Sequence, residues 1–353
     1  METTMYTLLA TAKANNASDL HITVGIKPKC RISGTLYEMD GFEVLTPAKT
    51  KELVESMFNE KQKHTMETLG EVDFAYTDNR VGRFRVNAFH QRGSYAAVLR
   101  IVGNRIPSPQ ELGVPDSVLG LTKKKRGLVL VTGPTGSGKS TTLASLIDVI
   151  NKERNEHIVT LEDPIEYLHK HNRSIVNQRE IGLDTDSYGN ALRAALREDP
   201  DIILVGEMRD FDTISTAITA AETGHLVFST LHTIGAAPTI ERIIDVFPPH
   251  QQNQIRTQLA SVLEAVISQQ LLPTIDGKSR VAAFEVMLGT PAIKNLIRED
   301  KAHQIPSIMQ TSKKLGMQTM DESLFSLYLK HKIDGANAVE FAQDMASMQQ
   351  KLY

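Results

Sequence analysis

Short apolar segments separated by turns dominate the first hundred residues. Two amphipathic patterns in this region indicate helices at 3–14 and 47–58, the second capped by Thr46. Alternating patterns predict strands at 20–24, 30–39 (with turns at Gly25 and Gly34), 72–76, 82–90 and 95–102. We therefore expect a small α+β domain with a mainly antiparallel sheet over residues 1–102.

A dense group of helix and strand breakers follows, and the pattern then changes. Residues 103–117 contain two glycines and three prolines, which is typical of a linker. From residue 118, apolar strands alternate with amphipathic helices, and this predicts a parallel sheet with crossover helices over 118–353. The expected strands are 128–132, 158–161, 202–205 and 226–230, and the expected helices are 139–150, about 188–198 and 213–222.

The last third of the chain reads as mostly helical from about residue 251. Its first apolar stripe consists of Ile255, Leu259, Val262, Leu263, Val266 and Ile267. These residues lie at spacings that place them on one face of a helix.

A glycine-rich loop joins the expected strand 128–132 to the expected helix 139–150. Its residues are Gly133, Pro134, Thr135, Gly136, Ser137, Gly138, Lys139 and Ser140, followed by Thr141. Backbone N–H groups and the positive end of the helix dipole at such a turn favour a polyphosphate. Lys139 would reach the β- and γ-phosphates, and the Ser140 hydroxyl would hold Mg²⁺. The loop therefore predicts a nucleotide triphosphate site.

Carboxylates follow two of the expected core strands, where a parallel sheet places its ligand crevice. Glu162, Asp163 and Glu166 come directly after strand 158–161, and Pro164 ends that strand. Glu207 follows the apolar strand 202–205, as in a Walker B element with Glu in place of Asp. We expect Glu207 to hold Mg²⁺, directly or through water.

Two histidines and three arginines are further candidates for contact with phosphate. His225 and His232 flank strand 226–230, and their spacing of seven fits no helical zinc motif. His232 suits a γ-phosphate sensor, with His225 as a helper. Arg83 and Arg85 alternate with Phe84 and Val86 on one strand, so the two arginines share a face, and Arg100 ends the next strand. Guanidinium groups bind phosphate well.

Composition limits the class of protein. The chain has 353 residues, 41% hydrophobic and 23% charged, with a formal net charge of −3. This mild acidity argues against binding to nucleic acid through bulk charge. The single cysteine excludes a disulfide framework and a zinc site of paired cysteines. The basic run at 123–126 is typical of a solvated turn. We find no signal peptide pattern and no apolar run long enough to span a membrane, which fits a cytoplasmic protein.

The order of these motifs resembles one family. The segment from Leu196 to Asp210, which reads LREDPDIILVGEMRD, is similar to the signature of the secretion-type ATPases of type II secretion and type IV pili. The phosphate loop, the acidic segment 162–166 and the two histidine segments follow in the family's order. Three further segments resemble its pilus retraction members: 18–21, 292–299 and 316–320.

The resemblance implies a PAS-like first domain and a RecA-like P-loop NTPase domain in a hexameric ring that hydrolyses ATP with Mg²⁺. It implies that Glu166 polarises the attacking water, that Glu207 is the Walker B carboxylate and that Arg85 and Arg100 face phosphate. It ties to retraction the segment Ala292, Ile293, Lys294, Asn295, Leu296, Ile297, Arg298 and Glu299, in which Lys294 replaces a common arginine. Its apolar residues also fit the buried stripe of an ordinary helix.

The implied partners are other copies of the chain, an inner-membrane pilus platform protein and a PilU-like paralogue. The implied location is the cytoplasmic side of the inner membrane. The extension ATPases of the family are disfavoured, because they carry an extra N-terminal domain and usually a four-cysteine zinc site.

Two alternatives stay open. The chain is an active retraction motor, or it is a PilU-like accessory subunit that binds nucleotide and acts mainly as a coupling surface. A RecA-type motor on DNA is a third reading, but the chain lacks the basic, aromatic surface that binds single strands.

Overall fold

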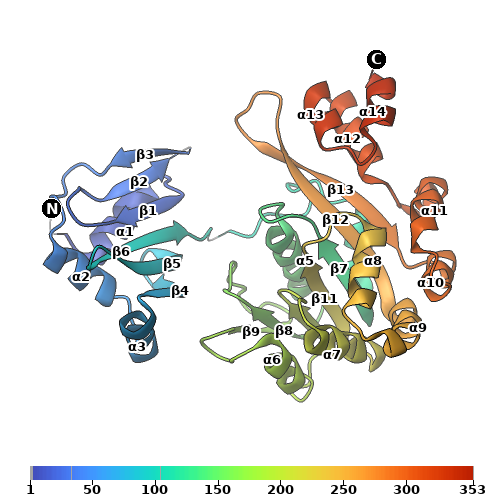
Figure 1. Ribbon diagram of the computed structural model, residues 1–353, viewed down its shortest axis with the longest axis horizontal. Helices are drawn as coiled ribbons and strands as arrows, with labels where there is room; N and C mark the ends of the chain where they lie inside the picture. Colours follow the sequence, from blue (N-terminus) through green and yellow to red (C-terminus); the bar gives the residue numbers. More distant parts are fainter. Residues whose placement is uncertain (1–2, 33, 104, 353) are drawn as a thin grey trace. The chain divides into compact units, whose positions relative to one another are not determined.

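The computed structural model describes residues 3–32, 34–103 and 105–352. The chain divides into two compact units, Met1–Arg105 and Ile106–Tyr353, each with its own sheet and core (Figure 1).

Unit 1 contains a six-stranded sheet in the order β3-β2-β1-β6-β5-β4, with antiparallel pairing throughout. The strands are β1 Asp19–Ile22, β2 Lys29–Ile32, β3 Thr35–Glu38, β4 Glu71–Asp78, β5 Gly82–Gln91 and β6 Ser94–Ile101. The helices are α1 Met5–Ala14, α2 Pro47–Glu55 and α3 Glu60–Leu69. The expected antiparallel α+β fold is confirmed, and Thr46 caps α2 as predicted. The apolar pattern does not predict α3, because Met66 is its only buried residue.

Unit 2 is built on a seven-stranded sheet in the order β13-β12-β7-β11-β10-β8-β9 (Figure 1). Six strands run parallel, and β13 adds an antiparallel edge. The strands are β7 Gly127–Thr132, β8 His157–Glu162, β9 Ile175–Glu180, β10 Ile202–Val205, β11 Leu226–Leu231, β12 Leu263–Pro273 and β13 Arg280–Leu288. All six residues of β7 are buried, as the continuous apolar run predicts for a strand covered on both faces.

Helices cover both faces of this sheet, and side chains of β7 alternate between the two cores. Leu128 and Leu130 pack with residues of α6 to α11, whereas Val129 and Val131 pack with α4 and α5. The α/β architecture with crossover helices is therefore confirmed. The helices are α4 Asp116–Leu119, α5 Lys139–Glu153, α6 Tyr188–Ala195, α7 Phe211–Glu222, α8 Ala236–Asp245, α9 Gln252–Val262, α10 Pro291–Arg298, α11 Ile305–Thr311, α12 Met320–Leu329, α13 Gly335–Glu340 and α14 Met345–Leu352.

The predicted helical stripe that runs through Ile267 is wrong. Helix α9 ends at Val262, and Leu263 begins β12, which pairs in parallel with β7. Val266 and Ile267 belong to the cores on opposite faces of the sheet, so their side chains have a period of two. A strand buried on both faces lacks the alternation of apolar and polar residues, and the spacing of Val262, Leu263, Val266 and Ile267 also fits one face of a helix.

The three C-terminal helices form a small cluster of their own at the end of β12 and β13 (Figure 1). A buried carboxylate ties this cluster to the main sheet. Glu285 of β13 accepts hydrogen bonds from the backbone N–H groups of Ala236 (2.7 Å) and Met320 (3.3 Å) and from Gln343 Nε2 (3.0 Å). In the part of the chain that the structure describes, no helix is both long and apolar enough to cross a membrane.

Candidate nucleotide-binding site

The glycine-rich loop turns the chain from β7 into α5, as predicted. Gly133, Gly136 and Gly138 all have positive φ (140°, 79° and 91°), which glycine adopts without strain. The ammonium of Lys139 lies inside the turn, where it donates to the carbonyls of Gly133 (2.8 Å) and Pro134 (3.1 Å). The loop thus curls around the Lys139 ammonium, which is hydrogen-bonded to its first two residues.

Two observations show that the loop fits a polyanion. The Ser137 hydroxyl is buried and has no hydrogen-bond partner among the described residues. Burial lowers the pKa of Lys139 below its usual value, and the carboxylates of Glu207 and Glu166 oppose that shift. A buried ammonium beside an unpaired hydroxyl favours an anionic ligand, since phosphate oxygens would satisfy both groups. Pro134, Thr135, Gly136 and Ser140 are exposed on the same loop.

Residue Gln269 of strand β12 packs against the phosphate loop. The Thr142 hydroxyl, one turn into α5, donates to Gln269 Oε1 (2.8 Å). A Cβ on Gly133 would lie 2.2 Å from the Gln269 carbonyl oxygen, and one on Gly138 would lie 2.9 Å from Gln269 Nε2. The loop is therefore packed directly on Gln269.

Glu207 lies at the end of β10, next to the loop. Its Oε1 accepts from Arg209 Nε (2.5 Å) and lies 3.1 Å from His232 Nε2. Burial alone would raise the pKa of Glu207, but the hydrogen bond and charge of Arg209, with those of His232, hold it below its usual value. The other ring nitrogen of His232 lies 3.5 Å from the Thr135 hydroxyl. His232 therefore bridges the end of β10 and the phosphate loop.

The acidic segment after β8 places its carboxylates in different surroundings. Glu162 Oε1 accepts hydrogen bonds from the Thr160 hydroxyl (2.6 Å) and from Gln178 Nε2 (3.0 Å). Burial raises the pKa of Glu162, and these hydrogen bonds oppose the shift. Asp163 and Glu166 are exposed. Glu162 is thus hydrogen-bonded to Thr160 and Gln178. The exposed carboxylate of Glu166 instead opposes the lowering of the Lys139 pKa through its charge.

Tyr167 fastens this segment to α5. Its hydroxyl lies 3.0 Å from that of Thr141, in the first turn of the helix. Ser140, the expected Mg²⁺ ligand, is the preceding residue. The structure therefore brings together the loop 133–141, Glu207, His232 and the segment that carries Glu166.

His225 lies elsewhere. It precedes β11, so it is at the amino edge of the parallel sheet, opposite the phosphate loop. Its Nδ1 lies 2.9 Å from the Ala220 carbonyl oxygen and 3.3 Å from the Thr223 hydroxyl, and its own carbonyl accepts from Gly127 N (3.0 Å). Within one chain His225 thus lies at the edge of the sheet opposite the phosphate loop, and its helper role toward phosphate stays a prediction.

The three candidate arginines belong to unit 1. Phe84 and Val86 are buried while Arg85 is exposed, as the alternation predicts. Arg85 and Arg100 are direct cross-strand partners in β5 and β6, so two positive charges lie side by side on one face. Arg100 is paired with Asp19 (3.1 Å), and Arg83 Nη1 donates to the Thr77 hydroxyl (3.3 Å).

Segment 292–299 forms most of α10. Ile293 and Ile297 are fully buried and Leu296 packs against the same core, so the predicted apolar stripe is confirmed. Ala292, Asn295, Arg298 and Glu299 are exposed. The Lys294 ammonium donates to the Ser261 carbonyl (3.1 Å) and lies 3.6 Å from a Glu264 carboxylate oxygen.

Several residues around the site were not predicted from the sequence. They are Arg209, Gln178, Glu180, Tyr188 and Gln269. Arg209 lies only two residues after Glu207, and this spacing alone could have predicted their ion pair. The Tyr188 hydroxyl lies beneath the end of β10, where a Cβ on Gly206 would be 2.8 Å from it. Burial and the charges of Asp163, Glu207 and Glu162 raise the pKa of Tyr188 strongly. The remaining residues come from strands that no motif marks.

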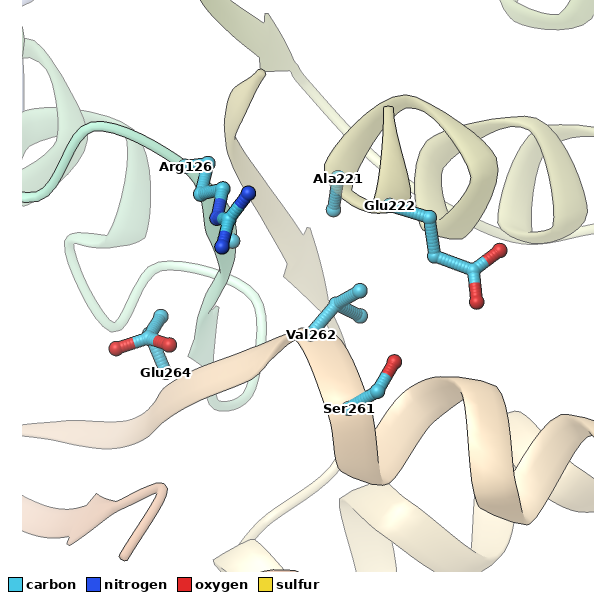
Figure 2. Close-up of a pocket in the computed structure, with 7 residues that line it drawn as sticks. Arg126, Ala221, Glu222, Ser261, Val262 and Glu264 are labelled. Atoms are coloured by element: carbon cyan, nitrogen blue, oxygen red, sulfur yellow. The ribbon is translucent and has the colours of Figure 1, made fainter. Parts of the chain in front are cut away.

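A separate pocket of about 360 Å³ opens at the amino edge of the sheet, near His225. Figure 2 shows Arg126 at this pocket, with the carboxylates of Glu222 and Glu264 pointing away from each other on opposite sides. Glu264 pairs with Lys124 (2.8 Å), and Glu222 Oε2 accepts from Gln258 Nε2 (3.0 Å). None of the predicted nucleotide-binding residues lines it, so it is distinct from the site at the phosphate loop.

The phosphate loop, the strand-end carboxylates and the parallel sheet define a P-loop nucleoside triphosphatase. The model of the T2SSE family, described as "Type II/IV secretion system protein", matches residues 2–314. This chain belongs to that family of secretion ATPases.

Similarity extends over the whole chain. The type IV pilus retraction ATPase PilT of Pseudomonas aeruginosa is 49% identical over 339 residues, which cover 95% of this chain and 97% of that protein. The type IV pilus ATPase PilU of the same organism is 42% identical over 335 residues, covering 95% of this chain and 87% of that protein. A crystal structure of the pilus retraction motor PilT with bound ADP superposes with a TM-score of 0.94 at 49% identity, covering 99% of this chain and all of that one.

Proposed function

We propose that this protein is an ATPase that powers retraction of type IV pili. The observation that carries the proposal is the 49% identity to PilT over 95% of the chain, together with an intact phosphate loop and its carboxylates. The lower identity to PilU, 42%, favours the active motor over an accessory subunit.

The residues of the site suit the steps of ATP hydrolysis. Backbone N–H groups of the loop and of the start of α5 would bind the phosphates. Lys139 would exchange its two carbonyl partners for phosphate oxygens, which relieves its buried charge. Ser140 and Glu207 would hold Mg²⁺, which when bound neutralises charge on the phosphates. Oxygen ligands of this kind are those that Mg²⁺ prefers.

Glu166 is the best placed carboxylate to orient the attacking water. It is exposed, and the Tyr167–Thr141 contact holds its segment beside the first turn of α5. Glu162 is less suited, because Thr160 and Gln178 already occupy its Oε1. His232 would report the state of the γ-phosphate, since it contacts both Glu207 and Thr135.

Arg85 and Arg100, with Arg83 beside them, would supply cations to phosphate. Like charges at directly opposed positions are unfavourable in a sheet. Asp19 pairs with Arg100 and offsets part of this repulsion, and a phosphate group would offset the rest. A guanidinium binds phosphate oxygens in a bidentate way.

The motor would work as a homohexamer on the cytoplasmic side of the inner membrane. Its partners would be the pilus platform protein and a PilU-like paralogue, and the exposed residues of α10 would form part of the contact for retraction. Arg298 is an exposed charged side chain there, and the exposed Glu299 accepts from Asn295 Nδ2 (2.7 Å) and pairs with Lys301 (2.8 Å).

The first test is hydrolysis of ATP by the purified chain in the presence and absence of Mg²⁺. We expect Mg²⁺-dependent turnover that Lys139→Ala abolishes and Glu166→Ala reduces to a small residual rate, while size-exclusion chromatography still shows the ring. Asn177→Ala, an exposed change on β9, serves as the control. An intact chain that binds ATP without turnover, and restores retraction only beside a second ATPase, would establish the accessory role instead.

A further inference from the structure

The segment that carries Glu166 is attached to one face of strand β9. Gln178 and Glu180 are two residues apart in β9, so their side chains project to the same side of the sheet. Glu180 Oε2 accepts from the backbone N–H of Ile165 (3.0 Å), and Gln178 Nε2 donates to the carbonyl of Tyr167 (2.8 Å). Glu166 therefore has a backbone anchor immediately before it and another immediately after it.

Gln178 makes further contacts that fix the whole segment. Its Nε2 also donates to Glu162 Oε1 (3.0 Å), and its Oε1 accepts from the His169 N–H (2.8 Å). Three of the four hydrogen bonds available to the amide are thus spent on the residues around Glu166. One side chain therefore joins Glu162, which precedes Glu166, to Tyr167 and His169, which follow it.

These anchors are costly to remove. Glu180 is only 4% exposed, and the Ile165 N–H that it accepts is buried. A buried polar group that loses its hydrogen-bond partner destabilises the local arrangement, so the segment could then leave its position. A side chain that must orient a water within hydrogen-bond reach tolerates little displacement.

We propose that Gln178 and Glu180 are positioning residues for hydrolysis, which hold the backbone on both sides of Glu166 so that its carboxylate faces the phosphate loop. This inference rests on the proposed function, in which Glu166 orients the attacking water. The side-chain hydrogen bonds given above join Gln178 and Glu180 to residues 162–169, which flank Glu166, so we expect the two residues to act on the rate of hydrolysis more than on nucleotide affinity.

The test compares kcat with KM. Gln178→Leu keeps the size of the side chain but removes its hydrogen bonds, and Glu180→Ala removes the anchor at Ile165. We expect each to lower kcat for ATP hydrolysis by about 10- to 100-fold. The KM for ATP and the Kd for ADP should stay within about threefold, because the phosphate loop is untouched. Glu180→Gln retains an acceptor for Ile165 N–H, so it should keep most of the activity.

Matched variants separate positioning from a general loss of structure. Asn177→Ala removes a contact with His157 Nε2 (3.1 Å) from the opposite face of β9 and should leave kcat unchanged. In a Glu166→Ala background, Gln178→Leu should cause no additional loss of the residual rate, since the two residues act as a unit. Gln178→Glu, which removes both donated hydrogen bonds at nearly constant shape, replaces Gln178→Leu if the latter does not fold.

The inference is overturned if kcat stays within about twofold in Gln178→Leu and Glu180→Ala. It is also overturned if the loss appears in KM or Kd, or is as large without Glu166 as with it. A wild-type chain with no ATP hydrolysis, or a fully active Glu166→Ala variant, would overturn the proposed function first, and the inference with it.

Discussion

The glycines of the phosphate loop all have positive φ but different surroundings. Gly133 is enclosed: a Cβ there would lie 2.2 Å from the carbonyl oxygen of Gln269, a backbone atom of the buried strand β12. Gly136 is open, with no atom within 4 Å of the corresponding position. Only the first position therefore combines positive φ with a collision that no side chain can relieve.

We expect Gly133→Ala to be far more damaging than Gly136→Ala. At Gly136 alanine meets no neighbouring atom, so the only penalty is the strain of an L-residue in the left-handed conformation, about 1–2 kcal/mol. At Gly133 it also displaces β12 or the loop, so binding of ADP should be lost or weakened more than tenfold. Isothermal titration with ADP and thermal unfolding of both variants would measure this. Equal affinities in the two variants would show that the packing on Gln269 is unimportant.

Residue roles could be predicted from the sequence where a motif carries the chemistry. Lys139 and Glu207 lie in recognisable segments, and the structure brings both to the same edge of the sheet. Gln178 and Gln269 were not predictable in this way, because each acts through a strand that becomes a neighbour only when the sheet forms. His225 and His232 flank the same strand, and within one chain only His232, at its carboxyl end, contacts the phosphate loop.

Helix α10 has a buried face and an exposed face. Ile293 and Ile297 are completely buried, whereas Arg298 and Glu299 are exposed at its end. Pro291 and the Thr290 cap begin the helix. The apolar face belongs to the core of unit 2, and the exposed face is the one that the proposed contact for retraction would use.

Two substitutions in α10 should separate these faces. Ile293→Ala should lower the free energy of unfolding by about 2–5 kcal/mol, because it opens a cavity in a packed core. Arg298→Ala should change it by less than about 0.5 kcal/mol and keep ATP hydrolysis, but should reduce twitching motility in cells. Thermal denaturation, an ATPase assay and a motility assay would test this. Normal motility with Arg298→Ala would exclude this charge from the contact for retraction.

Elements with a distinct period were predicted well, and the exceptions have physical causes. The core strands β7, β8, β10 and β11 are apolar runs bounded by glycine or charge, and they lie where expected. Strand β9 was missed because it is an edge strand with polar residues on both faces. The first half of strand β12 was predicted as a helix. Its central residues Ser268 and Gln269 are polar although they are buried, because they accept hydrogen bonds from Gly235 N and the Thr142 hydroxyl, and polar residues there hide the apolar pattern of a core strand.

At the scale of the molecule, the two units have separate cores, and the chain carries a natural reporter for one of them. Cys30 is the only cysteine in the sequence. It lies in β2 within the core of unit 1 and is 2% exposed. Burial raises the pKa of its thiol to about 11. The phosphate loop lies in unit 2, so the reactivity of the thiol reports on the unfolding of unit 1 alone.

We expect the native protein to resist thiol reagents at pH 8. Because the thiolate is the reactive form, the shift from 9.0 to about 11 alone lowers its fraction about 100-fold, and burial blocks access as well. Labelling should become fast only at urea concentrations that unfold unit 1.

The same thiol should make the stability of unit 1 depend on pH. As pH rises from about 9 toward 11, the Cys30 thiol ionises in the unfolded chain before it ionises in the folded one, so unit 1 should lose stability, and Cys30→Ala should remove this loss. A Cys30→Ala, Ser56→Cys double variant, with its thiol on the surface, should react at once in the folded state. Fast labelling of the native wild-type chain would show that unit 1 opens readily, and its core would then not be the closed one that the structure describes.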